Sequence, residues 1–262
     1  MTENAAAHYS EYLMVDPLLT LQQPLSTHPE HDELLFIIVH QTYELWFKQI
    51  VHELRAARGL LFAGLTDRAM AVLTRIRTVL KTCVSQVDIL ETMTPLQFES
   101  FRTRLGQASG FQSAQFREIE ALLGRRDRSA VAQLRPVDRM RVEHAMAEPT
   151  LWDATCHFMV SRGQALPTSI LERDVRVPYQ PTESVQQAVL TLYRTDQSAA
   201  LVFERLVDID VGMQEWRYRH VMMVERTIGS KSGTGGSTGV DYLRTTLFQP
   251  VFPELWRVRH QF

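Results

Sequence analysis

Apolar residues recur with helical spacing along most of this chain, and the pattern is strongest over residues 32–61. Apolar positions that repeat every three or four residues indicate an amphipathic helix. Two such stripes lie on this segment: one consists of Leu35, Ile38, Val39, Leu45, Trp46 and Ile50, and the other of Phe36, His40, Tyr43 and Phe47. A helix with two apolar faces is covered on both sides, so we expect it in the middle of a bundle.

The same spacing predicts further helices, and glycine and proline residues mark where they begin and end. Helices are expected over residues 66–92, 113–123, 149–162, 182–194, 196–228 and 240–247, and a short one starts at Pro95 and runs through Leu105. Thr94 has the position of an N-cap before that proline, and Gly229 has the position of a C-cap. Residues 124–148 are rich in charge and are expected at the surface. No segment shows clean alternation of apolar and polar residues, so the predicted fold class is all-α, a helical bundle.

Composition restricts the class of protein further. The chain has 262 residues, which suits one domain, and 28 Lys and Arg against 30 Asp and Glu give a net charge of −2. No basic excess is available to neutralise phosphates, so a nucleic-acid partner is not expected. The two cysteines, Cys83 and Cys156, cannot build a disulfide framework. No secretory signal and no membrane-spanning segment are recognisable, so we expect a cytoplasmic protein with no membrane association.

Two histidines occupy apolar helix faces. His40 has Phe36 four residues before it, and His220 has Trp216 four residues before it on a face that is rich in methionine. For His220, a lone neutral imidazole on an apolar, methionine-rich face is the arrangement that a haem iron requires from its protein ligand. On spacing alone, however, both patterns are more typical of core histidines that make one hydrogen bond.

One arginine lies on an otherwise apolar helix face. Phe98, Arg102 and Leu105 are spaced four and three residues apart and therefore share that face. The guanidinium group needs an anionic partner, which is either a buried carboxylate of the chain or the carboxylate of a substrate. The spacing does not decide between these alternatives. Residues 229–239 form a glycine-rich loop that suits either an anion site or a flexible linker.

Three separated blocks of the chain resemble the signature segments of the tryptophan 2,3-dioxygenase family. The blocks are HDELLFIIVHQTYELWFKQIVHEL, ETMTPLQFESFRTRLGQASGFQSAQFREIE and WRYRHVMMVERTIGSKSGTGGSTGVDYLR, and the short N-terminal YSEYL matches as well. The likeness runs almost from end to end and is weakest from Arg125 to Gln187. It implies an all-helical, cytoplasmic homotetramer that uses haem b, with ferrous iron in the active state and the haem bound between helices.

The resemblance assigns four residues to the cofactor. His220 is implied as the proximal ligand of the haem iron, and Arg117 matches an arginine near the propionates. Ser109 and Gly110 match a segment beside the haem. The resemblance therefore favours a haem ligand at His220 over an ordinary core histidine.

Five further residues are implied to form the substrate pocket. His40 corresponds to the distal histidine, which accepts the indole N–H, and Phe36 packs on the indole ring. Arg102 pairs with the carboxylate of the amino acid, and Phe98 and Leu105 complete that wall. Because an indole N–H is a very weak acid, we assign His40 to positioning rather than to obligatory proton abstraction.

The resemblance also divides the single domain, residues 1–262, into a body and two special segments. Residues 1–30 form an N-terminal arm that is exchanged with a neighbouring subunit, so that Tyr9 and Tyr12 reach the pocket of that subunit. Residues 229–239 are the active-site loop, in which Thr234 contacts the ammonium and carboxylate groups of the substrate.

The implied reaction is cleavage of the indole C2–C3 bond of L-tryptophan by dioxygen to N-formylkynurenine, the first step of the kynurenine route. One alternative is a haem monooxygenase or dioxygenase of the same fold that acts on a substituted tryptophan, and another is a silent haem- or tryptophan-binding sensor. One departure bears on this choice, because relatives usually carry a bulky aromatic residue at the position of Val87. The smaller side chain either widens the pocket near the haem or repacks the core.

Overall fold

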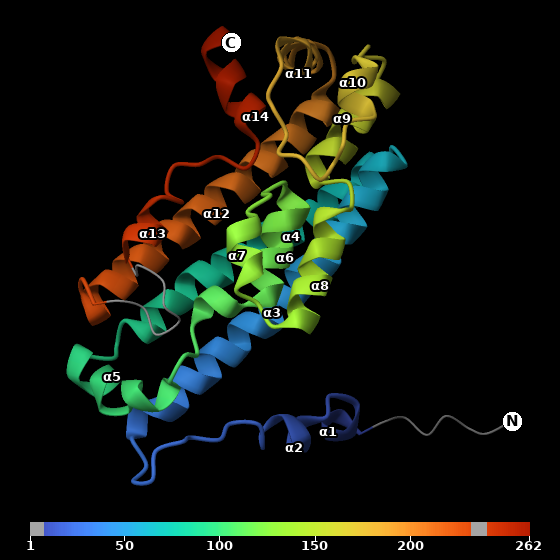
Figure 1. Cartoon of the computed structure of the whole chain (residues 1–262). Coiled ribbons are helices and arrows are strands. Elements are labelled where there is room, and N and C mark those ends of the chain that lie inside the picture. The colour runs from blue at the N-terminus through green and yellow to red at the C-terminus, as the bar shows by residue number, and fades with distance from the viewer. Residues whose placement is uncertain (1–7, 232–239) are drawn as a thin grey trace, which may run out of the picture.

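The computed structural model describes residues 8–231 and 240–262, and within these ranges the ordered elements are helices (Figure 1). The α-helices are α1 (Tyr9–Tyr12), α2 (Val15–Leu18), α3 (His31–Phe62), α4 (Thr66–Leu90), α5 (Pro95–Arg102), α6 (Ala114–Leu123), α7 (Arg128–Ala132), α8 (Pro136–Met146), α9 (Leu151–Ser161), α10 (Thr168–Leu171), α11 (Glu183–Thr195), α12 (Gln197–Ile228), α13 (Val240–Arg244) and α14 (Pro253–Arg257). Three 3-10 turns are η1 (Thr103–Leu105), η2 (Gly110–Gln112) and η3 (Val258–Gln261). The prediction of an all-α fold is confirmed.

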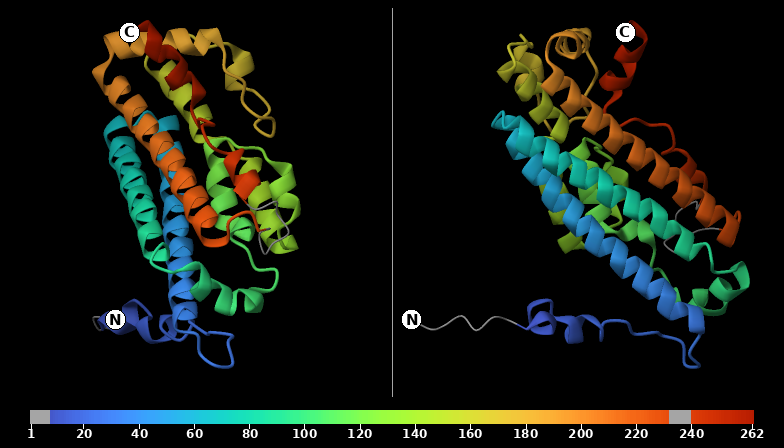
Figure 2. Two further views of the ribbon diagram at one scale, coloured as in Figure 1. Left: turned by 90° about the vertical axis from the view of Figure 1, so that its left-hand side faces the viewer. Right: turned by 180° about the vertical axis from the view of Figure 1, so that it is seen from behind.

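Three long helices form the frame of the molecule, and they run side by side in both views of Figure 2. Helix α4 packs along α3 on one side and along α12 on the other, and α6 and α9 pack on α3. The core between these helices consists of aliphatic and aromatic side chains such as Leu54, Ile76 and Phe203, which are almost completely buried. None of the helices in the described ranges is both long and apolar enough to cross a lipid bilayer.

Part of the first apolar stripe on α3 is not covered by this chain. Val39 and Ile50 are buried as expected, but Ile38 is 44% exposed and Leu45 is 53% exposed. The expectation that neighbours within the chain cover both faces of this helix is therefore wrong for these positions. The arm that carries α1 and α2 lies beyond the bundle (Figure 1), and Gln41 joins it to α3 by donating a hydrogen bond of 3.0 Å to the carbonyl of Leu21.

The residues that begin α5 and end α6 are those that the sequence predicts. Thr94 caps α5, because its hydroxyl accepts a hydrogen bond from the N–H of Gln97 and Pro95 fills the first turn. Helix α5 ends at Arg102, and the chain continues as the 3-10 turn η1 rather than as one helix through Leu105. Helix α6 ends at Leu123 and is capped by Gly124, whose φ of +115° a residue with a Cβ atom rarely adopts.

The charged segment that follows α6, residues 124–148, contains buried residues as well as exposed ones. It forms α7 and α8, and Val131, Leu134 and Val142 build a small second core in which each is at most 4% exposed. Helix α8 packs on α6. The expectation of an exposed segment is therefore wrong for these three residues, which are too widely spaced among charges to show a clear period.

The C-terminal segment is anchored by two carboxylates that are completely buried. Asp210 on α12 accepts hydrogen bonds from the backbone N–H groups of Val251 and Phe252 and from the indole N–H of Trp256. Glu254 on α14 accepts from the N–H of Thr182 at 2.7 Å and from the hydroxyl of Tyr179 at 2.9 Å. Because burial disfavours its charged form, the pKa of Glu254 is raised to about 7.

Glu254 is expected to make the folding stability depend on pH. Between the ordinary pKa of a glutamate, about 4.5, and about 7, the folded chain binds more protons than the unfolded chain. The free energy of unfolding therefore falls as the pH rises through this window, by about 3 kcal/mol from this group. In urea unfolding of the cofactor-free protein, Glu254→Gln should remove this part of the pH dependence, whereas Glu183→Gln at an exposed position should leave it. An unchanged pH profile in Glu254→Gln would contradict the assignment.

Candidate active site

A cavity of about 270 Å³ lies between the ends of the long helices, and α3, α5, α6, α12 and α13 all contribute to its walls. Its lining is mostly apolar and aromatic, with a few polar groups, as is typical of small-molecule sites. The sequence-predicted residues Phe36, His40, Phe98, Arg102, Leu105, Ser109, Gly110, Arg117 and His220 all line this cavity. Residues from four separated stretches of the chain thus meet at one place.

His40 is held in one orientation by the helix that carries it. Its Nδ1 lies 2.7 Å from the carbonyl oxygen of Phe36. A carbonyl can only accept, so Nδ1 carries the proton and Nε2 is left as a hydrogen-bond acceptor. Burial lowers the pKa of His40, which keeps the ring neutral near neutral pH.

A cluster of three phenylalanine rings lies beside that imidazole, and Phe36 is the member that contacts it. The ring of Phe36 lies 4.1 Å from the ring of His40, measured between centroids, and 5.7 Å from the ring of Phe98. Phe101 contacts both phenylalanines at 5.6 Å and 5.5 Å. Phe36 and Phe98 line the cavity and offer an aromatic surface to another planar aromatic group, whereas Phe101 is completely buried behind them.

His220 projects from α12 into the same cavity. Its ring is stacked on the indole of Trp216, with 5.0 Å between the ring centroids and 8° between the planes. Burial lowers the pKa of His220 to about 4, and the positive charge of Arg117 acts in the same direction. The imidazole is therefore neutral at physiological pH and keeps a lone pair that can bind a metal ion.

Arg102 supplies a positive charge to one wall of the cavity. Its Nη1 lies 3.6 Å from the carboxylate of Glu99 on the same helix, and that carboxylate lies 3.0 Å from the Nζ of Lys231. Glu99 is 47% exposed at its side chain, whereas the side chain of Arg102 is 16% exposed and lines the cavity. A guanidinium group at this wall can pair with a carboxylate of a bound ligand.

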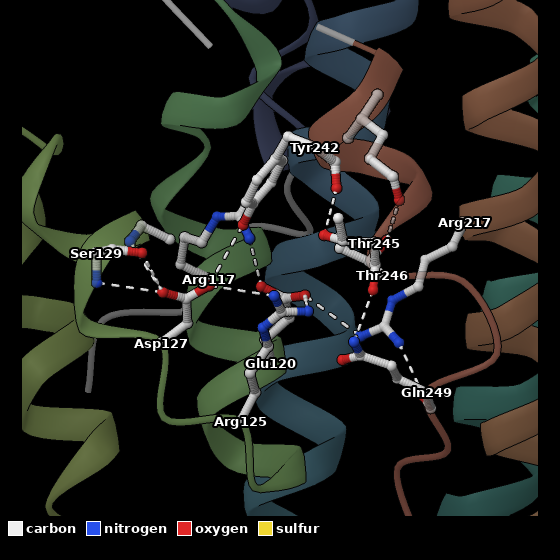
Figure 3. Close-up of polar contacts among 12 residues, drawn as sticks. Arg117, Glu120, Arg125, Asp127, Ser129, Arg217, Tyr242, Thr245, Thr246 and Gln249 are labelled. Carbon is white, nitrogen blue, oxygen red and sulfur yellow. Dashed lines mark hydrogen bonds and ion pairs between the residues drawn. The ribbon is translucent and has the colours of Figure 1, made fainter. Parts of the chain in front are cut away.

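Arg117 supplies a second positive charge at another wall. Its guanidinium group lies 4.8 Å from the ring centroid of Phe111 and donates a hydrogen bond of 2.5 Å from Nη1 to Glu120 (Figure 3). The Nε of Arg117 is buried and has no hydrogen-bond partner among the described residues. A buried donor without a partner is costly, so this position suits an anionic ligand group.

Two predicted site residues that the structure describes do not line the cavity of this chain. Tyr9 and Tyr12 lie on α1, and they are 73% and 77% exposed. Thr234 lies outside the described residues, and its contact with the substrate stays a prediction.

Val87 is buried in the core and is absent from the described residues that line the cavity. Its small side chain therefore belongs to the packing of the core and not to the cavity wall.

Several cavity residues were missed from the sequence. Glu120, Arg217 and Tyr242 line the cavity at the wall that carries Arg117. One signal was present, because Arg117 and Glu120 are three residues apart on the predicted helix and can form an ion pair. No local signal connects them to Arg217, which is almost one hundred positions away in the chain.

Comparisons with known proteins point to one family. A family model described as tryptophan 2,3-dioxygenase matches residues 1–139 and 170–262. The tryptophan 2,3-dioxygenase of Anaeromyxobacter sp. (strain K) is 55% identical over 258 residues, which are 98% of this chain and 96% of that protein. The proteins of the same name from Herpetosiphon aurantiacus and Bordetella pertussis are 51% and 42% identical, and they cover 97% and 96% of this chain and 98% and 89% of their own lengths.

The fold and the cavity define an all-α protein whose ligand site lies between helices and presents two neutral imidazoles and three arginines. The chain belongs to the tryptophan 2,3-dioxygenase family. The resemblance inferred from the sequence is thus confirmed, and the part that the family model leaves out, residues 140–169, lies where the likeness is weakest.

The residues present fit the haem that the family implies. His220 offers a neutral imidazole beside an apolar wall that includes Phe47, Phe116 and Val221. The buried Nε of Arg117 offers a donor for a carboxylate of the haem edge. No cluster of three or more His, Cys, Asp or Glu side chains that could hold a metal ion occurs in residues 8–231 and 240–262.

Proposed function

We propose that this chain cleaves the indole C2–C3 bond of L-tryptophan with dioxygen and releases N-formylkynurenine, as the first step of tryptophan degradation. The cavity carries this proposal, because it combines the acceptor of His40, the aromatic surface around Phe36 and the positive charge of Arg102. These groups match an amino acid with an indole side chain. The names of the relatives support the same reaction and give no support to a substituted tryptophan as the substrate.

Haem b is the proposed cofactor, with His220 as the residue that would hold the iron. Arg117 would pair with a propionate, and Ser109 and Gly110 would lie beside the ring. When bound, the ferrous haem supplies the binding and activation of dioxygen. The protein supplies an enclosed apolar surface and keeps the His220 ring neutral.

The remaining groups would position the substrate. His40 Nε2 accepts the indole N–H, Phe36 packs on the ring, and Arg102 binds the carboxylate. Phe98 and Leu105 close the wall beside Arg102 and exclude water from it. Fixing both ends of the substrate holds the C2–C3 bond in one place, which lowers the entropic cost of the reaction.

We further propose that residues 1–262 act as one domain within a cytoplasmic homotetramer. The exposed apolar residues Ile38 and Leu45 on α3 support an assembly, because they form part of a stripe that this chain leaves uncovered. Tyr9 and Tyr12 on the exposed arm would reach the cavity of a neighbouring subunit. The arm in Figure 1 lies outside the body of its own chain, which is compatible with such an exchange.

His40→Ala is expected to lower kcat/KM for L-tryptophan by roughly 10- to 100-fold, since one hydrogen bond and its alignment are lost. The same variant should lower turnover of 1-methyltryptophan much less, because that analogue has no indole N–H to donate. His52→Ala on the exposed side of the same helix is the matched control. Equal losses for both substrates would remove the assigned role of His40.

The proposed function is tested by measuring consumption of L-tryptophan by the haem-loaded, reduced protein in air. L-tyrosine and ring-substituted tryptophans are measured beside it, and the products are identified by mass. The proposal predicts that L-tryptophan has the highest kcat/KM and gives a ring-opened product. A higher kcat/KM for a substituted tryptophan would shift the assignment to secondary metabolism.

A further inference from the structure

Three arginines converge on one buried carboxylate, that of Glu120 on α6 (Figure 3). Arg117 and Arg125 are its neighbours in the sequence, and Arg217 comes from α12. Glu120 is 5% exposed, and its Oε2 lies 2.5 Å from the Nη1 of Arg117. Its Oε1 lies 3.3 Å from the Nη2 of Arg217 and 3.5 Å from the Nη1 of Arg125. Each oxygen of this carboxylate is therefore engaged by at least one guanidinium group.

The charges around Glu120 are unevenly buried. Arg117 and Arg217 are 8% and 7% exposed, whereas Arg125 is more accessible and has Asp127 as a second partner at 3.1 Å. A buried charge that loses its counter-ion is strongly destabilising. Glu120 is thus the carboxylate on which both buried guanidinium groups depend for charge compensation, and burial already lowers the pKa of Arg217.

Glu120 and its arginine partners connect two helices that form walls of the cavity. Arg117 lies on α6, and Arg217 lies on α12 three residues before His220. Next to the Glu120–Arg217 ion pair, the rings of Phe116 and Trp216 join the same two helices with 4.6 Å between their centroids. The ion pair therefore helps to set the distance between the wall that carries Arg117 and the helix that carries His220.

We propose that Glu120 is a positioning residue for the cofactor, which fixes Arg117 and, through Arg217, the register of His220 across the cavity. The inference rests on the proposed haem site and adds to it a residue that does not itself touch the haem iron. The proposed haem would contact His220 through its iron and Arg117 through a carboxylate at its edge. How tightly the protein retains the haem then depends on how rigidly His220 and Arg117 are held relative to each other.

The expected effect of Glu120→Gln on haem binding has opposite signs for a role in charge and a role in positioning. If Glu120 acted only through its charge, removing it would leave more positive charge at Arg117 and would strengthen the binding of an anionic haem edge. If Glu120 acts by positioning, the same change lets two guanidinium groups leave their places, and the haem is bound more weakly. The sign of the effect therefore separates the two roles.

The test is the rate at which haem leaves the reconstituted protein, measured by its transfer to an excess of apomyoglobin. Glu120→Gln should release haem about 10-fold faster than the unchanged protein, the change that loss of a supporting contact typically produces. Glu118→Gln is the matched control, because Glu118 on the same helix is buried like Glu120 and pairs with Arg55 and Arg141 at 2.9 Å and 2.5 Å. Glu118 is not among the described residues that line the cavity, and its variant should change haem release by less than about 3-fold.

Two further measurements separate a loss of folding stability from a loss of haem positioning. Thermal unfolding of the cofactor-free variants measures the structural cost, which should be similar for Glu118→Gln and Glu120→Gln. Glu120→Asp restores the charge with shorter reach and should recover part of the haem retention. If Glu120→Gln does not fold, Arg217→Lys is measured instead, and it should also release haem faster because a lysine cannot reach Glu120 and the carbonyl of Gln249 together.

Each outcome bears on one claim. Unchanged or slower haem release from folded Glu120→Gln, or equal acceleration in Glu118→Gln, would overturn the role of Glu120. An unchanged protein that binds no haem at all would instead remove the proposed cofactor site, so the two failures are distinguishable.

Discussion

His220→Ala should lose its haem during purification, or bind it on the order of 100-fold more weakly than the unchanged protein. The neutral imidazole that would hold the iron is removed, and the methyl group of alanine cannot replace it. The measurement is titration of the cofactor-free protein with haem, followed by the absorption of the bound form. Turnover of L-tryptophan should disappear with the bound haem.

A second histidine provides the control for this result. His157 on α9 is partly buried like His220, and its Nε2 lies 3.3 Å from the carbonyl oxygen of Leu171. His157→Ala should alter stability but not the affinity for haem, because His157 does not line the cavity formed by the described residues. Unchanged haem affinity in His220→Ala would refute the assigned ligand.

Arg102→Ala should raise the KM for L-tryptophan by roughly 30- to 150-fold, which corresponds to about 2–3 kcal/mol for a lost charge-assisted contact. The effect on kcat should be smaller, because the carboxylate lies away from the reacting ring and is held equally in the ground state and the transition state. Steady-state kinetics with L-tryptophan and tryptamine measure this directly. Tryptamine has no carboxylate, so its turnover should respond little to the substitution.

The matched variant is Arg104→Ala, two residues further along the same segment. Arg104 is exposed and is not part of the described cavity wall, so its removal should leave both substrates unaffected. An Arg102→Ala protein that kept its KM for L-tryptophan would show that the substrate carboxylate has another partner.

The long helices were predictable because each carries enough apolar residues at one spacing to outweigh local exceptions. Helix α12 was expected over residues 196–228 and begins at Gln197, where Asp196 caps it, and ends before Gly229. The small core of α7 and α8 was not predictable. Val131, Leu134 and Val142 become buried only because α6 packs beside them, which is a property of the tertiary structure.

The candidate site was predictable where the chain resembles a family and only partly from the residues alone. Spacing placed Phe98 and Arg102 on one face, and both line the cavity. Spacing could not raise His40 or His220 above ordinary core histidines, because the feature that distinguishes them is a cavity formed between separate helices. The Glu120–Arg217 pair joins residues 97 positions apart and was invisible for the same reason.

The most direct test of the account is the mass of the product formed from L-tryptophan under isotopically labelled dioxygen by the haem-loaded, reduced protein. The account predicts a ring-opened product that contains two labelled oxygen atoms, since both atoms of dioxygen enter the cleaved bond. A product with one labelled oxygen atom and an intact ring would contradict it and would identify the chain as a monooxygenase.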